Sequence, residues 1–300
     1  MSVLEVSGGI SKPIAPGPKP AASPGRAALR QYLYSLSGIA GAVILLLLVA
    51  MTLFGPLIYH VDPLDIVAAP FTPPGSDALL GTDYLGRDVL AGIVYGGKAT
   101  LTVGAIAALI TIVIGVTVGT ISGYFGGAAD TALVKVIEFF QILPPLLFAM
   151  VLVTLFGQTL TTITIAIGAV SWPSAARLTR AEFLRLRGLD YVKSSRAAGA
   201  TDRHVMLRVI LPNALPPIII AATLAIGVAI LFESGLSFLG LGDPNTMSWG
   251  LMIGQNRNYV LDGWWTVVFP GTAIFLAVLA ISLVGDGFND AINPRLRRRI

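Results

Sequence analysis

The stretch GIAGAVILLLLVAMTLFGPLIY, residues 38–59, contains no charged side chain. Four further stretches lack charges in the same way, at residues 101–127, 143–176, 211–232 and 263–285. A helix needs about 20 apolar residues to cross roughly 30 Å of hydrocarbon. The chain as a whole has 12% charged residues, whereas about a quarter of the residues in a soluble domain are charged. The sequence therefore predicts an all-α integral membrane protein.

Six segments are long enough to be transmembrane helices. They lie at residues 38–59, 101–122, 132–156, 160–177, 214–236 and 264–285. Pro144 and Pro145 predict a kink in the third span, and the short connection around Gly157 predicts a tight hairpin between the third and fourth. A cleaved signal peptide is the alternative for the first segment, but its apolar run is longer than the usual ~7–15 residues. We interpret it as a retained span.

The distribution of charge predicts the domain organisation and the orientation. Residues 1–35 form a basic N-terminal tail, residues 36–290 a six-helix membrane domain, and residues 291–300 a basic C-terminal tail. With both termini in the cytoplasm, 17 of the 20 lysines and arginines lie on the cytoplasmic side, as the positive-inside rule requires. The N-terminal tail is expected to be solvated and the C-terminal basic cluster at residues 295–299 to contact anionic lipid. A net charge of +4 gives no reason to expect a nucleic acid partner.

Two segments outside the spans are too long to be simple connections. In the outer one, residues 60–100, apolar residues from Val89 to Val94 have the spacing of an interfacial helix. In the inner one, residues 178–212, we expect a first helix with Asp190 as its cap, a left-handed turn at Gly199, and a second helix that ends at Pro212. The alternative for this inner segment is a solvated basic loop held near anionic lipid.

The string DYVKSSRAAGATDRHVMLRVILPN, residues 190–213, resembles the coupling loop of bacterial ABC importer permeases. In that family Glu-Ala-Ala is followed, after three residues, by Gly, then after nine by Ile, and after one more by Leu-Pro. Val209 replaces the Ile here, and residues 193–195 replace Glu-Ala-Ala. The resemblance implies contact with a cytoplasmic ATPase by Asp190, Tyr191, Val192, Lys193, Ser194, Ser195, Arg196, Ala197, Ala198, Gly199, Ala200, Leu211 and Pro212.

Four other strings resemble the C-type permeases of the dipeptide, oligopeptide and nickel importers. They are GTDYLGRDVLAGIVYGGKATLTVG (81–104), SGYFGG (122–127) followed by Asp130, ESGLSFLGLG (233–242) and GDGFNDAINPR (285–295). The last string departs from the family at Phe288, Asn289, Ile292 and Asn293. The resemblance covers residues 78–295 and implies the type I ABC importer permease fold, with six transmembrane helices and a cytoplasmic helix-Gly-helix coupling loop.

The same resemblance implies a function and a set of partners. The chain would form the translocation pathway of a di- or oligopeptide importer in the bacterial plasma (inner) membrane, together with a B-type permease. One or two cytoplasmic ATPase subunits would bind the ATP and magnesium, so that this chain binds no cofactor or metal and has no catalytic residue. An extracytoplasmic peptide-binding protein would deliver the substrate. Nickel, haem or another solute is the alternative cargo.

Enzymatic functions find little support in the sequence. Gly92, Gly97 and Lys98 satisfy most of a phosphate-binding loop, but Ala99 stands where a magnesium-binding hydroxyl is needed. Zero cysteines exclude disulfides and catalytic thiols, and neither of the two histidines lies within a predicted span, as an intramembrane Ser-His hydrolase would require.

An ion-coupled secondary transporter is the remaining alternative, and it needs ionisable groups near the midplane. Glu233 is the one serious candidate, about 25 Å along its helix from Pro216. It is either a carboxylate on the transport pathway or, as we favour, a buried carboxylate hydrogen-bonded across a subunit contact. Trp249 is expected in an interfacial aromatic belt, with contact to the binding protein as the alternative.

Overall fold

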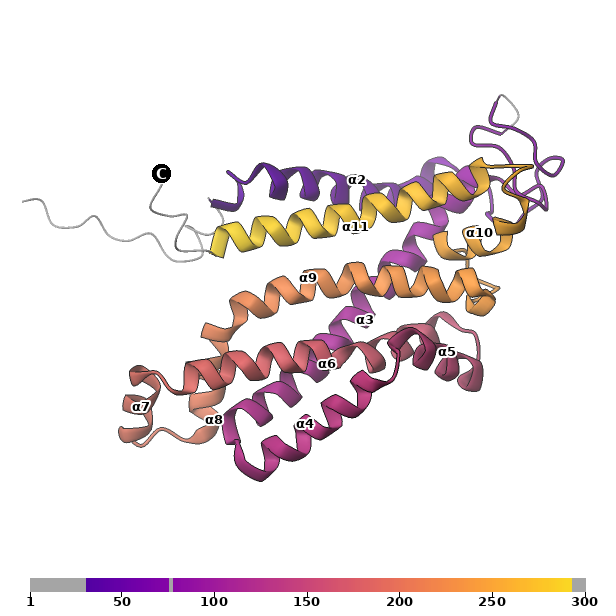
Figure 1. Cartoon of the computed structure of the whole chain (residues 1–300). Helices are drawn as coiled ribbons and strands as arrows, with labels where there is room; N and C mark the ends of the chain where they lie inside the picture. Colours follow the sequence, from indigo (N-terminus) through magenta and orange to yellow (C-terminus); the bar gives the residue numbers. More distant parts are fainter. Residues whose placement is uncertain (1–30, 76–77, 293–300) are drawn as a thin grey trace, which may run out of the picture.

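The computed structural model describes residues 31–75 and 78–292. Most of the two predicted tails, 1–35 and 291–300, therefore lies outside the described residues. The described part is helical; several long helices run in roughly the same direction, and another crosses them obliquely (Figure 1). The helices are α2 (Leu36–Ile58), α3 (Val89–Phe125), α4 (Gly127–Ile142), α5 (Pro145–Phe156), α6 (Leu160–Arg187), α7 (Asp190–Ala197), α8 (Asp202–His204), α9 (Leu211–Leu236), α10 (Trp249–Asn256) and α11 (Trp265–Ile292).

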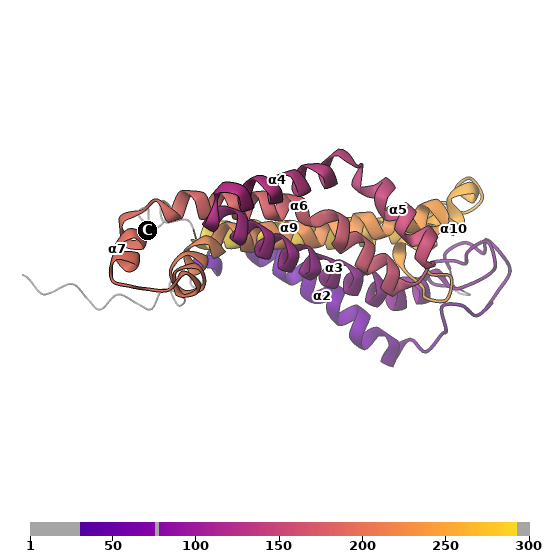
Figure 2. The ribbon, with the colours of Figure 1, turned by 90° about the horizontal axis from the view of Figure 1, so that it is seen from below.

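Two π-helical segments extend α9 at both ends. The first, Val205–Ile210, joins α8 to α9, and the second, Ser237–Leu241, follows α9 directly. A short 3₁₀ helix, Arg257–Tyr259, follows α10. The two ends of the bundle are named here by the short helices that they contain, the α7 end and the α10 end (Figures 1 and 2).

Helices occupy all six positions at which spans are predicted, but they differ in how well they suit a bilayer. Helices α2, α3, α9 with its extensions, and α11 are long and apolar enough to cross a membrane. Helices α4 and α5 pass the same test only as a pair, bent by 83° at the break before Pro145. This bend confirms the predicted kink. Helix α6 (28 residues) is not among the helices that pass, because its charge-free part, residues 160–176, is short and contains several Ser and Thr residues, and the rest of the helix to Arg187 is basic.

Close packing of α3 against α6 depends on glycines at every fourth position of α3. A β-carbon at Gly115, Gly119 or Gly123 would lie 2.5–2.6 Å from atoms of α6. Glycine is therefore the residue that lets these two helix backbones approach, as in other membrane helix pairs. Helices α2 and α11 pack in the same way, where Gly38 of α2 meets Gly287 of α11.

The α10 end corrects two expectations. Val89, Ile93 and Val94 do not form a separate interfacial helix; they begin α3, where they are 1–7% exposed. Asp88 caps α3 by accepting a hydrogen bond from the N–H of Ala91 at 3.0 Å, so the helix starts earlier than the apolar run. Trp249 lies in the core instead of an interfacial belt, with 0% exposure, and its indole Nε1 donates to the Ile93 carbonyl at 2.9 Å.

The segment between α2 and α3 is a folded cap with little regular structure. Asp83 organises it, because its Oδ1 accepts hydrogen bonds from the N–H groups of Leu85 and Arg87, both at 2.8 Å. Burial raises the pKa of the Asp83 carboxyl, and those hydrogen bonds and the charge of Arg87 lower it only in part. This cap closes the α10 end over the core residue Trp265, whose Nε1 donates to the carbonyl of Thr82.

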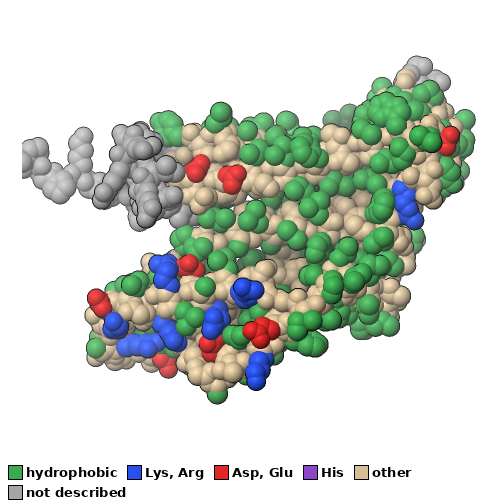
Figure 3. Space-filling model, in the orientation of Figure 1, with side chains coloured by type: hydrophobic (Ala, Val, Ile, Leu, Met, Phe, Trp, Pro, Cys, Tyr) green, Lys and Arg blue, Asp and Glu red, His purple; other side chains and the backbone are tan. Residues whose placement is uncertain are grey.

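Charge is unevenly distributed over the surface. On the face shown in Figure 3, lysines and arginines gather at the α7 end, whereas the middle of the molecule presents mainly hydrophobic side chains. Many large apolar side chains of the long helices are exposed, among them Leu46 (68%) and Leu109 (61%). Exposed apolar surface of this extent on long helices is typical of a membrane-embedded protein, in which lipid covers it.

Candidate coupling site

Helix α7 and the turn after it form the helix-Gly-helix unit that the sequence predicts. Gly199 has φ +84°, the left-handed conformation that favours glycine. The N–H of Ala200 donates to the carbonyl of Ser195 at 3.2 Å, and that of Gly199 donates to the carbonyl of Arg196 at 3.0 Å. These bonds satisfy the last carbonyls of α7. The predicted turn at Gly199 is therefore confirmed.

Both predicted boundaries of this unit are wrong in detail. The cap of α7 is Leu189, which forms no side-chain capping bond, and Asp190 is the first helical residue, paired with Lys193 at 3.3 Å. The second helix does not end at Pro212 but continues from Asp202 through α9 as far as the kink at Gly240, whose φ is +86°. The π-helical segment Val205–Ile210 ends two residues before Pro212, and its wider turn accommodates a proline that cannot donate to the preceding turn.

One face of α7 is anchored in a hydrophobic cluster and the other is exposed. Val192 is 0% exposed and belongs to a cluster with Phe183, Leu186, Val205 and Ile210, which come from α6 and the π-helical segment. Within residues 190–200 the exposed residues are Asp190, Tyr191, Lys193, Ser194, Arg196, Ala197, Ala198 and Gly199. The outer face of α7 is thus largely polar, and its inner face is held by the hydrophobic cluster around Val192.

Tyr124, near the end of α3, connects this loop to the long helices. Its hydroxyl donates to Oδ1 of Asp202 at 2.5 Å, and the guanidinium of Arg196 lies 4.8 Å from the centre of its ring. Arg187, the last residue of α6, donates to the carbonyls of Gly123 and Tyr124 at 3.1 and 3.2 Å. Tyr124 itself is 4% exposed, whereas its partners Asp202 and Arg196 are exposed, so these contacts lie at the boundary between the packed helices and the loop surface.

A second polar cluster joins α3, α4 and α6 close to Tyr124. Asp130 of α4 accepts two hydrogen bonds from Arg180 of α6, at 2.6 and 2.7 Å. The hydroxyl of Ser122 in α3 donates to the same carboxylate at 2.5 Å. A two-point Arg-carboxylate pair holds α4 and α6 in a defined relative orientation.

Sequence reasoning missed the roles of Tyr124, Asp130 and Arg180. The string SGYFGG and the following Asp130 were distinctive, but nothing in their spacing shows that they meet residues 50–80 positions later in the chain. Leu211 and Pro212, which the resemblance places in the coupling site, lie at the start of α9. They therefore continue the loop into a long helix.

Glu233 is far from the coupling loop, at the α10 end. It is 1% exposed, and its Oε1 accepts hydrogen bonds from the hydroxyls of Ser248 (2.7 Å) and Ser237 (2.9 Å). The expected bonds across a subunit contact are therefore wrong, since these partners belong to the same chain. Glu233 joins α9 to the segment before α10, and its part in a transport pathway stays a prediction. Among the described residues, no group of three or more His, Cys, Asp or Glu is arranged to hold a metal ion.

Comparison with known proteins identifies the family. Residues 115–298 match the family described as "Binding-protein-dependent transport system inner membrane component". The chain belongs to this family of transport permeases. Residues 23–74 additionally match the "N-terminal TM domain of oligopeptide transport permease C", the region in which our sequence analysis found no distinctive string. A transport permease of this family is a multi-pass membrane protein and not a catalytic enzyme.

Named relatives of this permease cover nearly its whole length. It is 37% identical to the di/tripeptide transport system permease protein DppC of Pseudomonas aeruginosa, over 89% of this chain and 91% of the relative. It is 39% identical to the dipeptide transport system permease protein DppC of Bacillus subtilis, over 87% and 82%. Among solved structures, a chain of the inward-facing MetNI methionine ABC transporter has a TM-score of 0.58 and 19% identity, over 67% of this chain and 96% of that one. This last likeness supports the permease fold.

Proposed function

We propose that this permease is the C-type transmembrane subunit of an ATP-driven importer of di- or oligopeptides. The relatives that are 37–39% identical to it are named as dipeptide and di/tripeptide permeases. The translocation pathway forms together with a B-type permease. One or two cytoplasmic ATPase subunits bind ATP and magnesium, and an extracytoplasmic binding protein delivers the peptide.

The anchored loop after α6 is the observation that carries the proposed coupling role. Force applied to the exposed face of α7 reaches α3 through Tyr124 and α6 through the cluster around Val192. A rigid unit converts closure of an ATPase into rigid-body motion of the long helices, whereas a solvated loop would absorb it. The exposed residues of α7 and Gly199 are thus the proposed ATPase contact, and Leu211 and Pro212 carry the motion into α9.

The proposed topology has six spans with both termini in the cytoplasm. The bent pair α4 and α5 forms the third span, and the apolar first part of α6 forms the fourth. In this arrangement the α7 end, which contains most of the described lysines and arginines, lies in the cytoplasm, as the positive-inside rule predicts.

Reconstitution tests the energy source and the substrate together. The purified chain alone should show no ATPase activity above background, while the complete complex in liposomes should hydrolyse ATP and import a tripeptide. Tripeptide uptake by this chain alone, driven by a proton gradient, would contradict the proposal and favour a secondary transporter. Uptake of nickel or haem in place of peptide by the complete complex would keep the coupling mechanism but change the cargo.

A further inference from the structure

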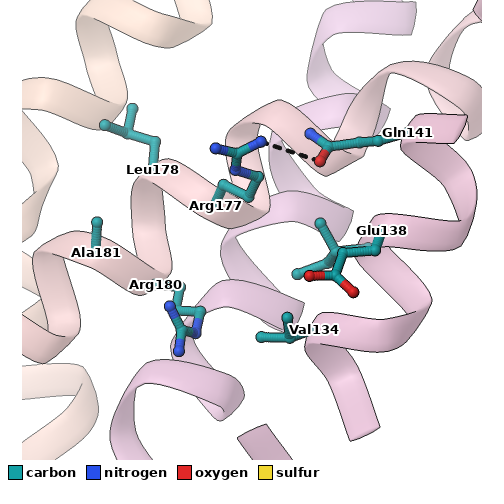
Figure 4. Close-up of a pocket in the computed structure, with 8 residues that line it drawn as sticks. Val134, Glu138, Gln141, Arg177, Leu178, Arg180 and Ala181 are labelled. Atoms are coloured by element: carbon teal, nitrogen blue, oxygen red, sulfur yellow. Dashed lines mark hydrogen bonds between the residues drawn. The ribbon is translucent and has the colours of Figure 1, made fainter. Parts of the chain in front are cut away.

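Two cavities follow one another along the face between α4 and α6. The first, of about 440 Å³, is lined by residues of α4, the start of α5, α6 and α9, including Phe140, Ser171, Ser174 and Phe232. The second, of about 560 Å³, lies closer to the α7 end and is lined by α4 and α6 alone, including Glu138 and Arg180 (Figure 4). Both volumes are in the range of small-molecule sites.

Arg177 and Gln141 line both cavities. The Arg177 guanidinium donates to Oε1 of Gln141 at 3.1 Å, which forms a bridge from α6 to α4 (Figure 4). On α6, the other lining residues of the first cavity lie at 170–174, before Arg177, and those of the second at 178–181, after it, so the pair marks the passage between the two cavities.

Charge in this region is only partly neutralised. In the described chain Arg177 forms no ion pair within 4.0 Å, and Gln141 is a neutral partner; Glu138 likewise has no ion pair. Arg180 differs, because its guanidinium is bound at two points by Asp130. An unpaired cation and an unpaired carboxylate therefore share one cavity, which suits a ligand with both an anionic and a cationic group.

Polar groups continue along α6 toward the middle of the span. Ser171, Ser174 and Arg177 are spaced by three residues and so lie on one helix face. The hydroxyl oxygen of Ser171 is buried and has no hydrogen-bond partner in the described chain. Arg177 lies about 26 Å along the helix from Leu160 and Ser171 about 16 Å. A lipid headgroup would be held at the membrane surface, near Arg177. The polar face extends about two helical turns further into the membrane, to Ser171, which suits a ligand that passes through the membrane better than a lipid headgroup.

We propose that the two cavities are successive positions of the transported peptide, that Arg177 binds its terminal carboxylate in the passage, and that Glu138 receives its terminal ammonium. This inference rests on the proposed peptide transport. The guanidinium exchanges the neutral Gln141 oxygen for a carboxylate, which is a stronger acceptor, so the bridge opens as the peptide arrives. Gln141 closes the passage again when the peptide has left.

The test compares variants in the complete complex, reconstituted in liposomes with its binding protein and ATPases, using trialanine as the probe. Arg177→Gln should lower trialanine imported per ATP by roughly tenfold, the effect of losing one strong charge-assisted hydrogen bond, and Glu138→Gln should lower it several-fold. Arg177→Lys, which keeps the charge, should retain most of the activity. The matched control is Arg185→Gln, on the same helix but bound to Glu182 and outside both cavities, and it should import normally.

A crosslinking measurement locates the peptide independently of any variant. A tripeptide with a photoreactive side chain, trapped in the wild-type complex with vanadate, should label residues 134–141 and 171–181. Label confined to other segments would overturn the inference, as would normal import per ATP by Arg177→Gln. Loss of a bound phospholipid from Arg177→Gln, seen by native mass spectrometry together with unchanged trialanine import, would assign the site to lipid instead. If the wild-type complex imports no peptide at all, it is the proposed function that fails.

Discussion

Gly199 has a backbone conformation that other residues adopt only at a cost. A β-carbon placed there would meet no atom within 4 Å, so the restriction is purely one of backbone torsion at φ +84°. The left-handed conformation costs a residue with a β-carbon about 1–2 kcal/mol, and a β-branched residue more. The turn itself, and not a packing contact, requires glycine at this position.

Gly199→Val should therefore change the orientation of α7. Membrane insertion and pairing with the partner permease should stay intact. We expect weaker co-purification of the ATPase subunits, or ATP hydrolysis without peptide uptake, measured on one reconstituted preparation. Gly188→Ala is the control, because Gly188 has φ −81° and a β-carbon there would have no neighbour closer than 3.9 Å. Gly126→Ala would not serve as a control, because Gly126 also has a left-handed backbone, with φ +68°. Normal transport per ATP in Gly199→Val would show that the loop does not couple.

Tyr124→Phe isolates one hydrogen bond of the coupling site. The substitution keeps the ring beneath Arg196 but removes the donor to Asp202, a bond to a charged group worth about 1.5–3 kcal/mol. We expect peptide imported per ATP to fall several-fold, with ATPase binding retained, since the exposed face of α7 is unchanged. Tyr259→Phe is the matched control, because Tyr259 is 38% exposed and lies after α10, at the opposite end of the bundle from the coupling site. Equal effects of the two substitutions would argue against a connecting role for Tyr124.

At the scale of helices, irregular segments occur where a long helix bends or where its turns widen into π-helix. The break at Pro144 and Pro145 divides the third predicted span into α4 and α5. The π-helical segment before Pro212 lets the coupling loop continue into α9 without a break. Both features follow from the same property of proline, which removes a backbone donor and crowds the preceding turn; the surrounding helix decides between a bend and a wider turn.

Gly119→Ala tests the contact between α3 and α6. Its β-carbon would lie 2.5 Å from the carbonyl oxygen of Ala176, a backbone atom that cannot move aside alone. The helices would have to separate, and we expect a loss of about 1–3 kcal/mol in the free energy of unfolding, measured by denaturation in mixed micelles. Gly227→Ala in α9 is the control, since its β-carbon would make an ordinary 3.6 Å contact with Val278. If Gly119→Ala is no less stable than Gly227→Ala, close glycine packing is not what holds these helices together.

At the scale of the whole molecule, the separation of charged from apolar surface implies an orientation. The α7 end is rich in arginine and lysine, and the long helices expose apolar side chains between the two ends (Figure 3). Of the described basic residues, only Arg87, Lys98 and Arg257 lie in the segments predicted to face outward. The two ends are thus expected on opposite sides of the bilayer.

Cysteine labelling tests this orientation directly, because the chain contains no cysteine of its own. Leu261→Cys, at a fully exposed position near the α10 end, should react with an impermeant maleimide in intact cells. Ser194→Cys, on the exposed face of α7, should react only after the membrane is opened. Labelling of Ser194→Cys from outside would mean that the number of spans or the orientation is wrong.

The sequence by itself determined the helical membrane class, the six apolar segments, the kink at the paired prolines and the left-handed turn at Gly199. Each of these follows from local chemistry: charge-free length, the missing N–H of proline and the missing β-carbon of glycine. Only the tertiary structure decided that Trp249 and Glu233 are buried within the chain, that α3 begins at Val89, and that Tyr124 meets Asp202. These facts depend on which helix faces lie together, and a contact between residues 78 positions apart leaves no trace in the spacing of either one.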